Sequence, residues 1–330
     1  MREVLANESD NAALEADRVD IMSALAVARE CCQGNDLEQC RLYIRAVGAL
    51  ARFLGFRNAL SERVVWGKSA LEVAELIGDD SAIAELCAST IAWPLLQLGH
   101  YPEAEQYCLQ GLKAAQRCGN SRVAARWAGN ASRSLSGIAR DADDGLKAQH
   151  WAEKAAIYGR RCEDESLIRG AKLDFGYAAL LLGDFEEAER LFAALLEEEE
   201  RGGDEERIGN RSGDTALAIM NRALRSDVAA ERTRLCDQAR ANVERSLRLG
   251  EKIKHAVLVG ECELALATLA RIQGDEDEYR RFIANGRRRF EELGIRRKGR
   301  AEQFVTFPGD LEQGASGAGG AAGTDGRDRG

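Results

Sequence analysis

Apolar residues recur every three to four positions along most of the chain, which is the spacing of one face of an α-helix, and glycines interrupt the pattern at intervals. Four interruptions share a turn in which glycine follows an apolar or amide side chain. These glycines are Gly55, Gly99, Gly183 and Gly274. They are 44, 84 and 91 residues apart, so the last two intervals are close to double periods, with less regular turns expected at 141–144 and 226–227. A period of this length is typical of a helical repeat.

The residues around the four turn glycines follow a common pattern. Seven positions before each glycine the residue is small, and eight positions before it the residue is large and apolar. The small residues are Gly48, Ala92, Gly176 and Ala267. Twelve positions after the turn the residues are Gly67, Gly111, Leu195 and Gly286, of which only Leu195 is large. Because antiparallel helices approach closely only where one of them lacks a bulky side chain, each repeat is predicted to be a packed helical hairpin.

A second set of glycines, each followed by Asp, Asn or Glu, separates one hairpin from the next. This set is Gly34, Gly78, Gly119, Gly203 and Gly250. The two sets together predict thirteen helices, at 10–33, 36–54, 57–77, 80–98, 101–118, 121–140, 144–161, 165–182, 185–201, 206–224, 228–249, 252–273 and 276–293. Pro94 lies inside helix 80–98 and is expected to kink it or end it early.

Two of the turns carry a family resemblance. The segments GHYPEAE (99–105) and GDFEEAE (183–189) resemble the turn between the two helices of a tetratricopeptide (TPR) repeat. The period is longer than the usual 34 residues, and it resembles the repeats of kinesin light chains and the sensor arms of bacterial STAND ATPases with an NB-ARC domain. Over about residues 36–293, the resemblance implies an all-α fold, an α-α superhelix or TPR-like solenoid of about six hairpins plus an N-terminal helix.

The domain organisation follows from where the pattern begins and ends. The helical repeat is expected over 10–300, preceded by a flexible N-terminus at 1–9. Residues 301–330 are predicted to be a disordered Gly/Ala-rich tail, because 314–330 contain no bulky apolar side chain to bury.

Composition excludes several other classes of protein. Only 6% of the residues are aromatic and only three are proline, so a β-sandwich is not expected. No apolar run approaches the roughly 20 residues that cross a bilayer, and residues 1–10 are not a signal peptide. The nine cysteines form no CxxC pair and are interpreted as packing residues of a reduced, cytoplasmic protein.

Charge offers one candidate interaction site. The chain has a net charge of −9, yet residues 280–300 contain nine basic and two acidic side chains. This basic segment could contact RNA or DNA, or it could be a polar cap on the last hairpin, which a solenoid requires. The cap is favoured because the chain as a whole is acidic, so a nucleic-acid partner is not expected.

Two short motifs resemble a phosphate-binding site and a metal-binding site, but each lacks residues that such a site needs. Gly67-Lys68-Ser69 ends like a phosphate-binding loop, but Glu62 stands where that loop needs a glycine. His150 and Glu153 share one helix face, yet a metal site needs three or four ligands, and the other two histidines lie in different repeats. With no recognisable nucleophile and base, the sequence predicts no enzyme activity, no cofactor and no metal.

The resemblance also implies which residues face a ligand. The inner helices of the hairpins would be 36–54, 80–98, 121–140, 165–182, 206–224 and 252–273. The candidate partner-binding residues on their concave face are Arg45, Thr90, Trp93, Arg126, Asn130, Arg133, Asp174 and Tyr177. For Trp93 and Tyr177 the alternative is burial in the core between repeats. The repeated Lys and Asn residues of a clamp for chaperone-tail carboxylates are absent from these positions.

The sequence thus predicts a non-enzymatic scaffold that binds a peptide or protein segment in its concave groove. The alternative is a ligand-sensing, regulatory TPR arm of a STAND (NB-ARC-type) ATPase or transcriptional regulator, with the ATPase part absent from this chain and a STAND ATPase as a possible partner. Nucleic-acid binding through 280–300 is the third hypothesis.

Overall fold

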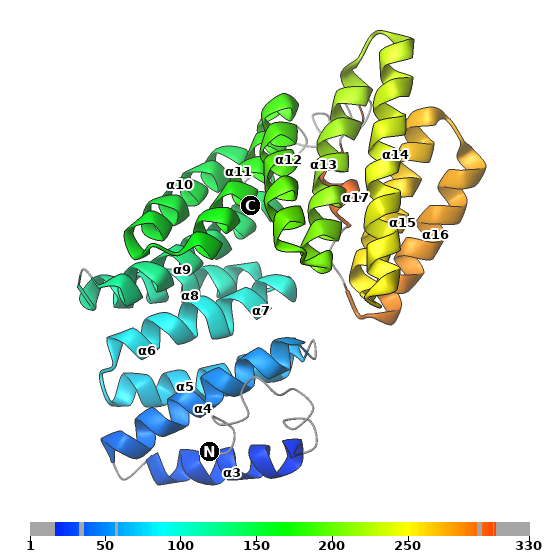
Figure 1. The fold of residues 1–330 in the computed structure, drawn as a ribbon. Coiled ribbons are helices and arrows are strands. Elements are labelled where there is room, and N and C mark those ends of the chain that lie inside the picture. The colour runs from blue at the N-terminus through cyan, green and yellow to red at the C-terminus, as the bar shows by residue number, and fades with distance from the viewer. Residues whose placement is uncertain are drawn as a thin grey trace, which may run out of the picture. The chain divides into compact units, whose positions relative to one another are not determined.

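The structure is a computed structural model that describes residues 17–32, 36–56, 59–119, 121–295, 299–305 and 307 of the 330-residue chain. All regular secondary structure within these ranges is helical (Figure 1). The helices form two compact units, Met1–Asp184 and Phe185–Gly330. The all-α helical-repeat prediction is confirmed, while residues 1–9 and 314–330, with their predicted flexibility and disorder, lie outside the described ranges.

The first unit is a series of helical hairpins that follows helix α3. Its elements are α3 (Arg18–Cys31), α4 (Leu37–Phe56), α5 (Leu60–Leu76), α6 (Asp80–Glu85), the π-helical turn η2 (Leu86–Ile91), α7 (Ala92–Gln97), α8 (Tyr101–Arg117), α9 (Arg122–Asp141), α10 (Gly145–Cys162) and α11 (Glu165–Leu182). Helix α4 pairs with α5, the α6–η2–α7 segment with α8, and α9 with α10. The first helices of successive hairpins also contact each other, and we call the surface that they form the first-helix face.

The second unit continues the same pattern. Its helices are α12 (Phe185–Gly202), α13 (Glu205–Arg225), α14 (Ala229–Lys252), α15 (Ala256–Gln273), α16 (Glu276–Glu292) and α17 (Arg300–Phe304). Helices α13 and α14 form one hairpin, α15 and α16 the next, and α17 packs on α15 and α13. The sequence pattern placed the start of the tail at residue 301, but the ordered chain extends further, because Ala301, Phe304 and Val305 are buried.

Most helix boundaries follow the predicted signals. Asp79, Ser121, Asp144, Asp164, Asp204 and Asp275 each accept a hydrogen bond from a backbone N–H of the first helical turn. Two glycines predicted to end helices do not. Helix α4 continues through Gly55 to Phe56. Helix α14 passes Gly250, whose added Cβ would lie 3.2 Å from Val259 Cγ2, and Lys254 takes the left-handed conformation instead, with φ at 56°.

Pro94 disturbs its helix as expected. The predicted helix 80–98 is divided into α6, the π-helical turn η2 and α7, with Pro94 in the first turn of α7. Proline has no N–H to donate to the preceding turn, and its ring crowds that turn. The wider π-helical turn immediately before Pro94 gives the ring room.

Gly67 shows why small residues recur in the repeat. A Cβ added to Gly67 in α5 would lie 2.8 Å from Ile91 Cγ1 and 2.9 Å from Thr90 Cγ2, so α5 reaches η2 only because this side chain is missing. This packing accounts for the glycine of the GKS motif. At Gly48 in α4, by contrast, the nearest atom to an added Cβ is Glu85 Oε1 at 4.0 Å.

The cysteines are mostly core residues. Seven of the nine are buried, Cys118 is half-buried and Cys31 is exposed. Burial raises the pKa of the Cys87 and Cys108 thiols to about 12, so both remain protonated at neutral pH. Within the described ranges, no helix is both long enough and apolar enough to cross a membrane.

We expect Gly67→Ala to lower the free energy of unfolding by about 1–3 kcal/mol, because the new methyl group overlaps Ile91 and Thr90. The matched control is Gly48→Ala, which has room for the methyl group and should raise stability by about 0.5–1 kcal/mol through helix propensity. Urea denaturation measures both. Equal effects of the two substitutions would contradict the close contact between α5 and η2.

Candidate functional site

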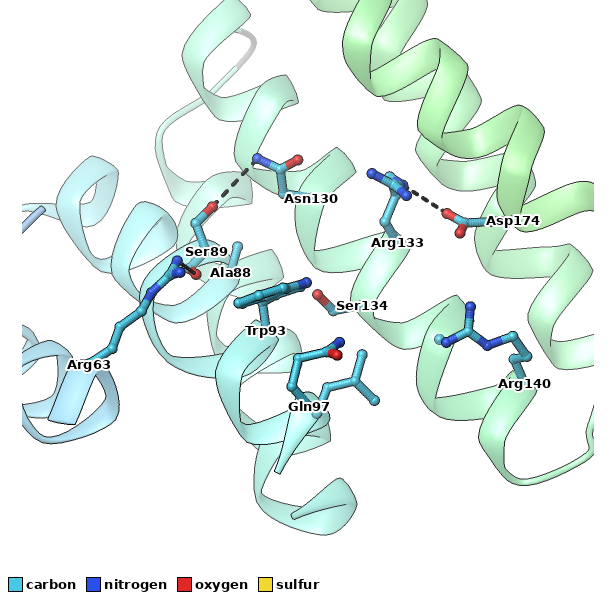
Figure 2. Close-up of a pocket in the computed structure, with 12 residues that line it drawn as sticks. Arg63, Ala88, Ser89, Trp93, Gln97, Asn130, Arg133, Ser134, Arg140 and Asp174 are labelled. Atoms are coloured by element: carbon cyan, nitrogen blue, oxygen red, sulfur yellow. Dashed lines mark hydrogen bonds and ion pairs between the residues drawn. The ribbon is translucent and has the colours of Figure 1, made fainter. Parts of the chain in front are cut away.

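A pocket of about 430 Å³ lies on the first-helix face of the first unit (Figure 2). Its walls come from α5, η2, α7, α9 and α11, so it spans several successive repeats. Four of the eight residues predicted from the sequence line it, namely Trp93, Asn130, Arg133 and Asp174.

The other four predicted residues lie elsewhere. Arg45 is exposed on α4, outside the pocket. Arg126 pairs with Asp164, with 2.9 Å between Arg126 Nε and Asp164 Oδ2. Thr90 and Tyr177 are buried, at 4% and 5% exposure, so for Tyr177 the structure agrees with the core alternative. Trp93, in contrast, is 41% exposed.

The π-helical turn shapes one wall of the pocket. In a π-helical turn, the donor for the carbonyl of Ser89 would be the backbone N–H of residue 94, which proline lacks. Arg63 in α5 supplies a donor instead, and its Nη2 lies 2.6 Å from the Ser89 carbonyl oxygen. The Ser89 hydroxyl is 3.5 Å from Asn130 Nδ2 on α9. Pro94 therefore helps to position a charged side chain at the pocket.

Arg63 is a desolvated cation. Burial lowers the pKa of its guanidinium to about 10, which still leaves it charged at pH 7. Among the described residues, no carboxylate lies within ion-pair distance of Arg63, and its buried Nε has no hydrogen-bond partner. The guanidinium carbon is 5.2 Å from the centre of the Trp93 ring, a cation–π contact. A charge held in this way attracts an anion.

The opposite wall holds a paired charge. Arg133 Nε donates to Asp174 Oδ2 at 2.9 Å, and the Asp174 side chain is only 7% exposed. Gly170 in α11 makes room for this pair, because an added Cβ would lie 2.3 Å from Arg133 Cζ. The Arg133–Asp174 pair thus links α9 to α11 at the pocket.

Arg140 completes the cationic lining. Desolvation opposes its charge, but Asp141, Tyr177 and Asp174 together hold its pKa above the ordinary value. Its guanidinium carbon lies 4.9 Å from the centre of the Tyr177 ring, and its Nε lies 3.1 Å from Asp141 Oδ1. The buried Tyr177 therefore does not line the pocket, but its ring stabilises the Arg140 guanidinium that does.

Taken together, the lining combines three guanidinium groups, one carboxylate, two side-chain amides and an exposed indole. This set can hold an anionic group beside a flat or apolar one. In the described part of the chain, no group of three or more His, Cys, Asp or Glu side chains is placed to bind a metal ion.

Sequence reasoning missed Arg63 and Arg140 for different reasons. Arg63 lies on α5, the second helix of its hairpin, whereas the resemblance to TPR repeats points to ligand contacts on the first helices. It reaches the pocket along the close contact that Gly67 allows between α5 and η2. Arg140 precedes a turn without glycine, where Asp143 takes the left-handed conformation, so its position relative to the turn could not be fixed.

The basic segment 280–300 belongs to the second unit, and its described arginines face carboxylates. Arg287 lies 2.9 Å from Glu302, Arg289 lies 3.0 Å from Glu263, and Arg288 lies 4.0 Å from Glu292. Residues 296–298 are outside the described ranges. Ion pairing of this kind is what a polar cap on the last hairpin would show.

Comparison with solved structures identifies the fold. The crystal structure of BtubC (BKLC) from P. vanneervenii is 16% identical, with a TM-score of 0.52, and the match covers 73% of this chain and 94% of that one. The apo form of RapI is 13% identical, with a TM-score of 0.55, over 89% of this chain and 95% of that one. BtubC is a kinesin-light-chain-like TPR protein and RapI is a TPR-type helical repeat protein, so the predicted TPR-like fold is confirmed.

At these identities the likeness establishes the fold alone. No family model matches the chain, and no curated protein sequence matches it.

We predict different effects on stability for two arginines of the pocket. Arg63→Met should change the free energy of unfolding by less than about 1 kcal/mol, because the lost hydrogen bond to the Ser89 carbonyl is offset by removal of a desolvated charge that has no carboxylate partner, and the apolar stem is kept. Arg133→Met should lower it by about 1–3 kcal/mol, because Asp174 is left buried without its hydrogen-bonded cation. Urea denaturation at pH 7 measures both. A larger loss for Arg63→Met than for Arg133→Met would show that Arg63 is held for stability.

Proposed function

We propose that this protein is a non-enzymatic interaction scaffold that binds a segment of another protein in the pocket of its first unit, with an acidic group of the segment at Arg63 and an apolar side chain against Trp93. The observation that carries the proposal is the pairing of a desolvated guanidinium with a 41% exposed indole in one pocket of about 430 Å³. Arg63 also donates to the Ser89 carbonyl, but neither its charge nor the exposure of the indole is explained by that hydrogen bond.

The chemistry of the lining favours a partner of this kind. Arginine and tryptophan are the side chains that most often dominate binding energy at protein interfaces. Arg63 is already desolvated in the unbound protein, so an incoming carboxylate gains a strong interaction without the full cost of stripping water from both charges. Asn130 and Gln97 also line the pocket and supply amide donors and acceptors for a peptide backbone.

The rigidity of the scaffold supports the same conclusion. The pocket residues are carried by packed helices and are linked across them, through Arg63 with Ser89 and Arg133 with Asp174. Because these side chains are largely fixed before a partner arrives, little conformational entropy of the protein is lost on binding.

The proposal is tested by panning a phage-displayed random peptide library against the full-length chain and measuring the dissociation constants of the selected peptides. We expect enrichment of Asp or Glu next to an apolar residue. Trp93→Ala and Arg63→Met should each raise the dissociation constant at least about tenfold, which corresponds to about 1.4 kcal/mol. Binding should also weaken as salt rises.

Matched controls separate the pocket from the rest of the surface. Leu146→Ala removes a 71% exposed side chain from α10, and Arg161→Met removes an exposed arginine from the same helix. Both should leave the dissociation constant within about twofold of wild type. If selected peptides bind Trp93→Ala and Arg63→Met as tightly as the controls, the pocket is not the binding site.

A further inference from the structure

The short helix α17 lies across the first helices of two successive hairpins. It packs on α15 and contacts α13, within the second unit (Figure 1). Ala301 and Phe304 are its inward side chains, at 1% and 4% exposure. About 10 Å³ of space remains where Arg300 and Ala301 meet α13, α14 and α15, so this side of α17 is closely packed, and a pocket of about 290 Å³ lies between α17, α15 and α16.

Arg300 enters this groove toward two buried carboxylates. Its Nη1 lies 2.5 Å from Asp214 Oδ1 on α13, and its Nε lies 3.7 Å from Glu261 Oε2 on α15. The side chains of Asp214 and Glu261 are 0% and 4% exposed. Arg211 contacts Asp214 at 3.2 Å and supplies the other cation. Because buried charges are tolerated only when compensated, the guanidinium of Arg300 stabilises both carboxylates of this groove.

The backbone of α17 is recognised as well. The N–H of Arg300 donates to Glu261 Oε2 at 2.7 Å, and Asn221 Nδ2 on α13 donates to the carbonyl oxygen of Phe304 at 2.9 Å. Asn221 is itself only 3% exposed. The groove thus binds both ends of one helical turn and the arginine side chain at its start, which is how a receptor holds a peptide.

A terminal cap would have a different arrangement. It would cover the open end of the last hairpin alone, whereas α17 pairs with Arg287 of α16 and also packs on α15 and contacts α13, the first helix of the preceding hairpin. The carboxylates that hold Arg300 come from both hairpins.

We propose that the first-helix face of the second unit is a binding groove for a segment of a partner protein with arginine and, four residues later, an aromatic side chain, and that α17 is the resident occupant which such a segment displaces. A helix of five residues is too short to be stable alone, so α17 stays ordered only while it is seated. Its covalent link raises its effective concentration and keeps weaker competitors out. This groove is separate from the pocket of the first unit, and the proposal goes beyond the function proposed there.

The test uses the full-length chain and a fluorescein-labelled peptide with the sequence of residues 299–307, GRAEQFVTF. Ala301→Asp places a charge at a 1% exposed position of α17 and should displace this helix while leaving the groove residues unchanged. Fluorescence anisotropy should show the peptide binding Ala301→Asp at least tenfold more tightly than wild type. A peptide in which the residue equivalent to Arg300 is alanine should lose at least tenfold of that affinity.

The matched control is Ala284→Asp, the same change at an exposed position of α16, which should bind the peptide as weakly as wild type. If folded Ala301→Asp, verified by circular dichroism, binds no better than this control, the proposal is overturned. If Ala301→Asp does not fold, Phe304→Ala provides the same comparison, with an expected gain of about threefold. Loss of folding in both variants also overturns the proposal, because α17 would then be a fixed part of the core.

Discussion

The structure depends on one constraint, which is that helices pack closely where one of them carries a glycine and therefore no side chain. Gly67 allows α5 to touch η2, and the same contact brings Arg63 within reach of Ser89. Without this close contact, Arg63 would be too far from η2 to line the pocket, because it lies on the second helix of its hairpin. The absence of a side chain at Gly67 therefore has two effects. It allows close packing of α5 against η2, and it places the Arg63 guanidinium at the pocket.

Both units place ionic groups on the first-helix face, but they use them differently. In the first unit Arg63 is desolvated and lacks a carboxylate partner among the described residues. In the second, Asp214 and Glu261 are buried and contacted by Arg300 of α17. Buried charge adds little to stability compared with apolar packing, which supports the proposed role of this face in recognition. The ligands proposed for the two units are therefore of opposite charge, acidic for the first unit and basic for the second.

The repeat pattern predicted the fold well because helix pairing depends on the spacing of turn, small and apolar residues that are close together in the sequence. Turn glycines such as Gly99 and Gly183, and caps such as Asp164, act within one or two helical turns of their own position. The candidate site was only half predictable. Trp93 and Asp174 were found by position in the repeat, but Arg63 acts across a helix contact and α17 depends on partners from two hairpins. Such long-range pairing leaves no periodic signal in the sequence.

The π-helical turn η2 has a consequence for how such a pocket can arise. A π-helical turn carries one residue more than the α-helical path that it replaces, so it shifts the angular register of everything after it by about 100°. Trp93 follows this turn directly, at the start of α7. The direction in which the indole points is therefore set by the number of residues before it as much as by their identity. A single-codon deletion in this helix would turn Trp93 and the buried Leu95 and Leu96 by the same angle, so the aromatic wall and the packing of α7 depend on one residue count.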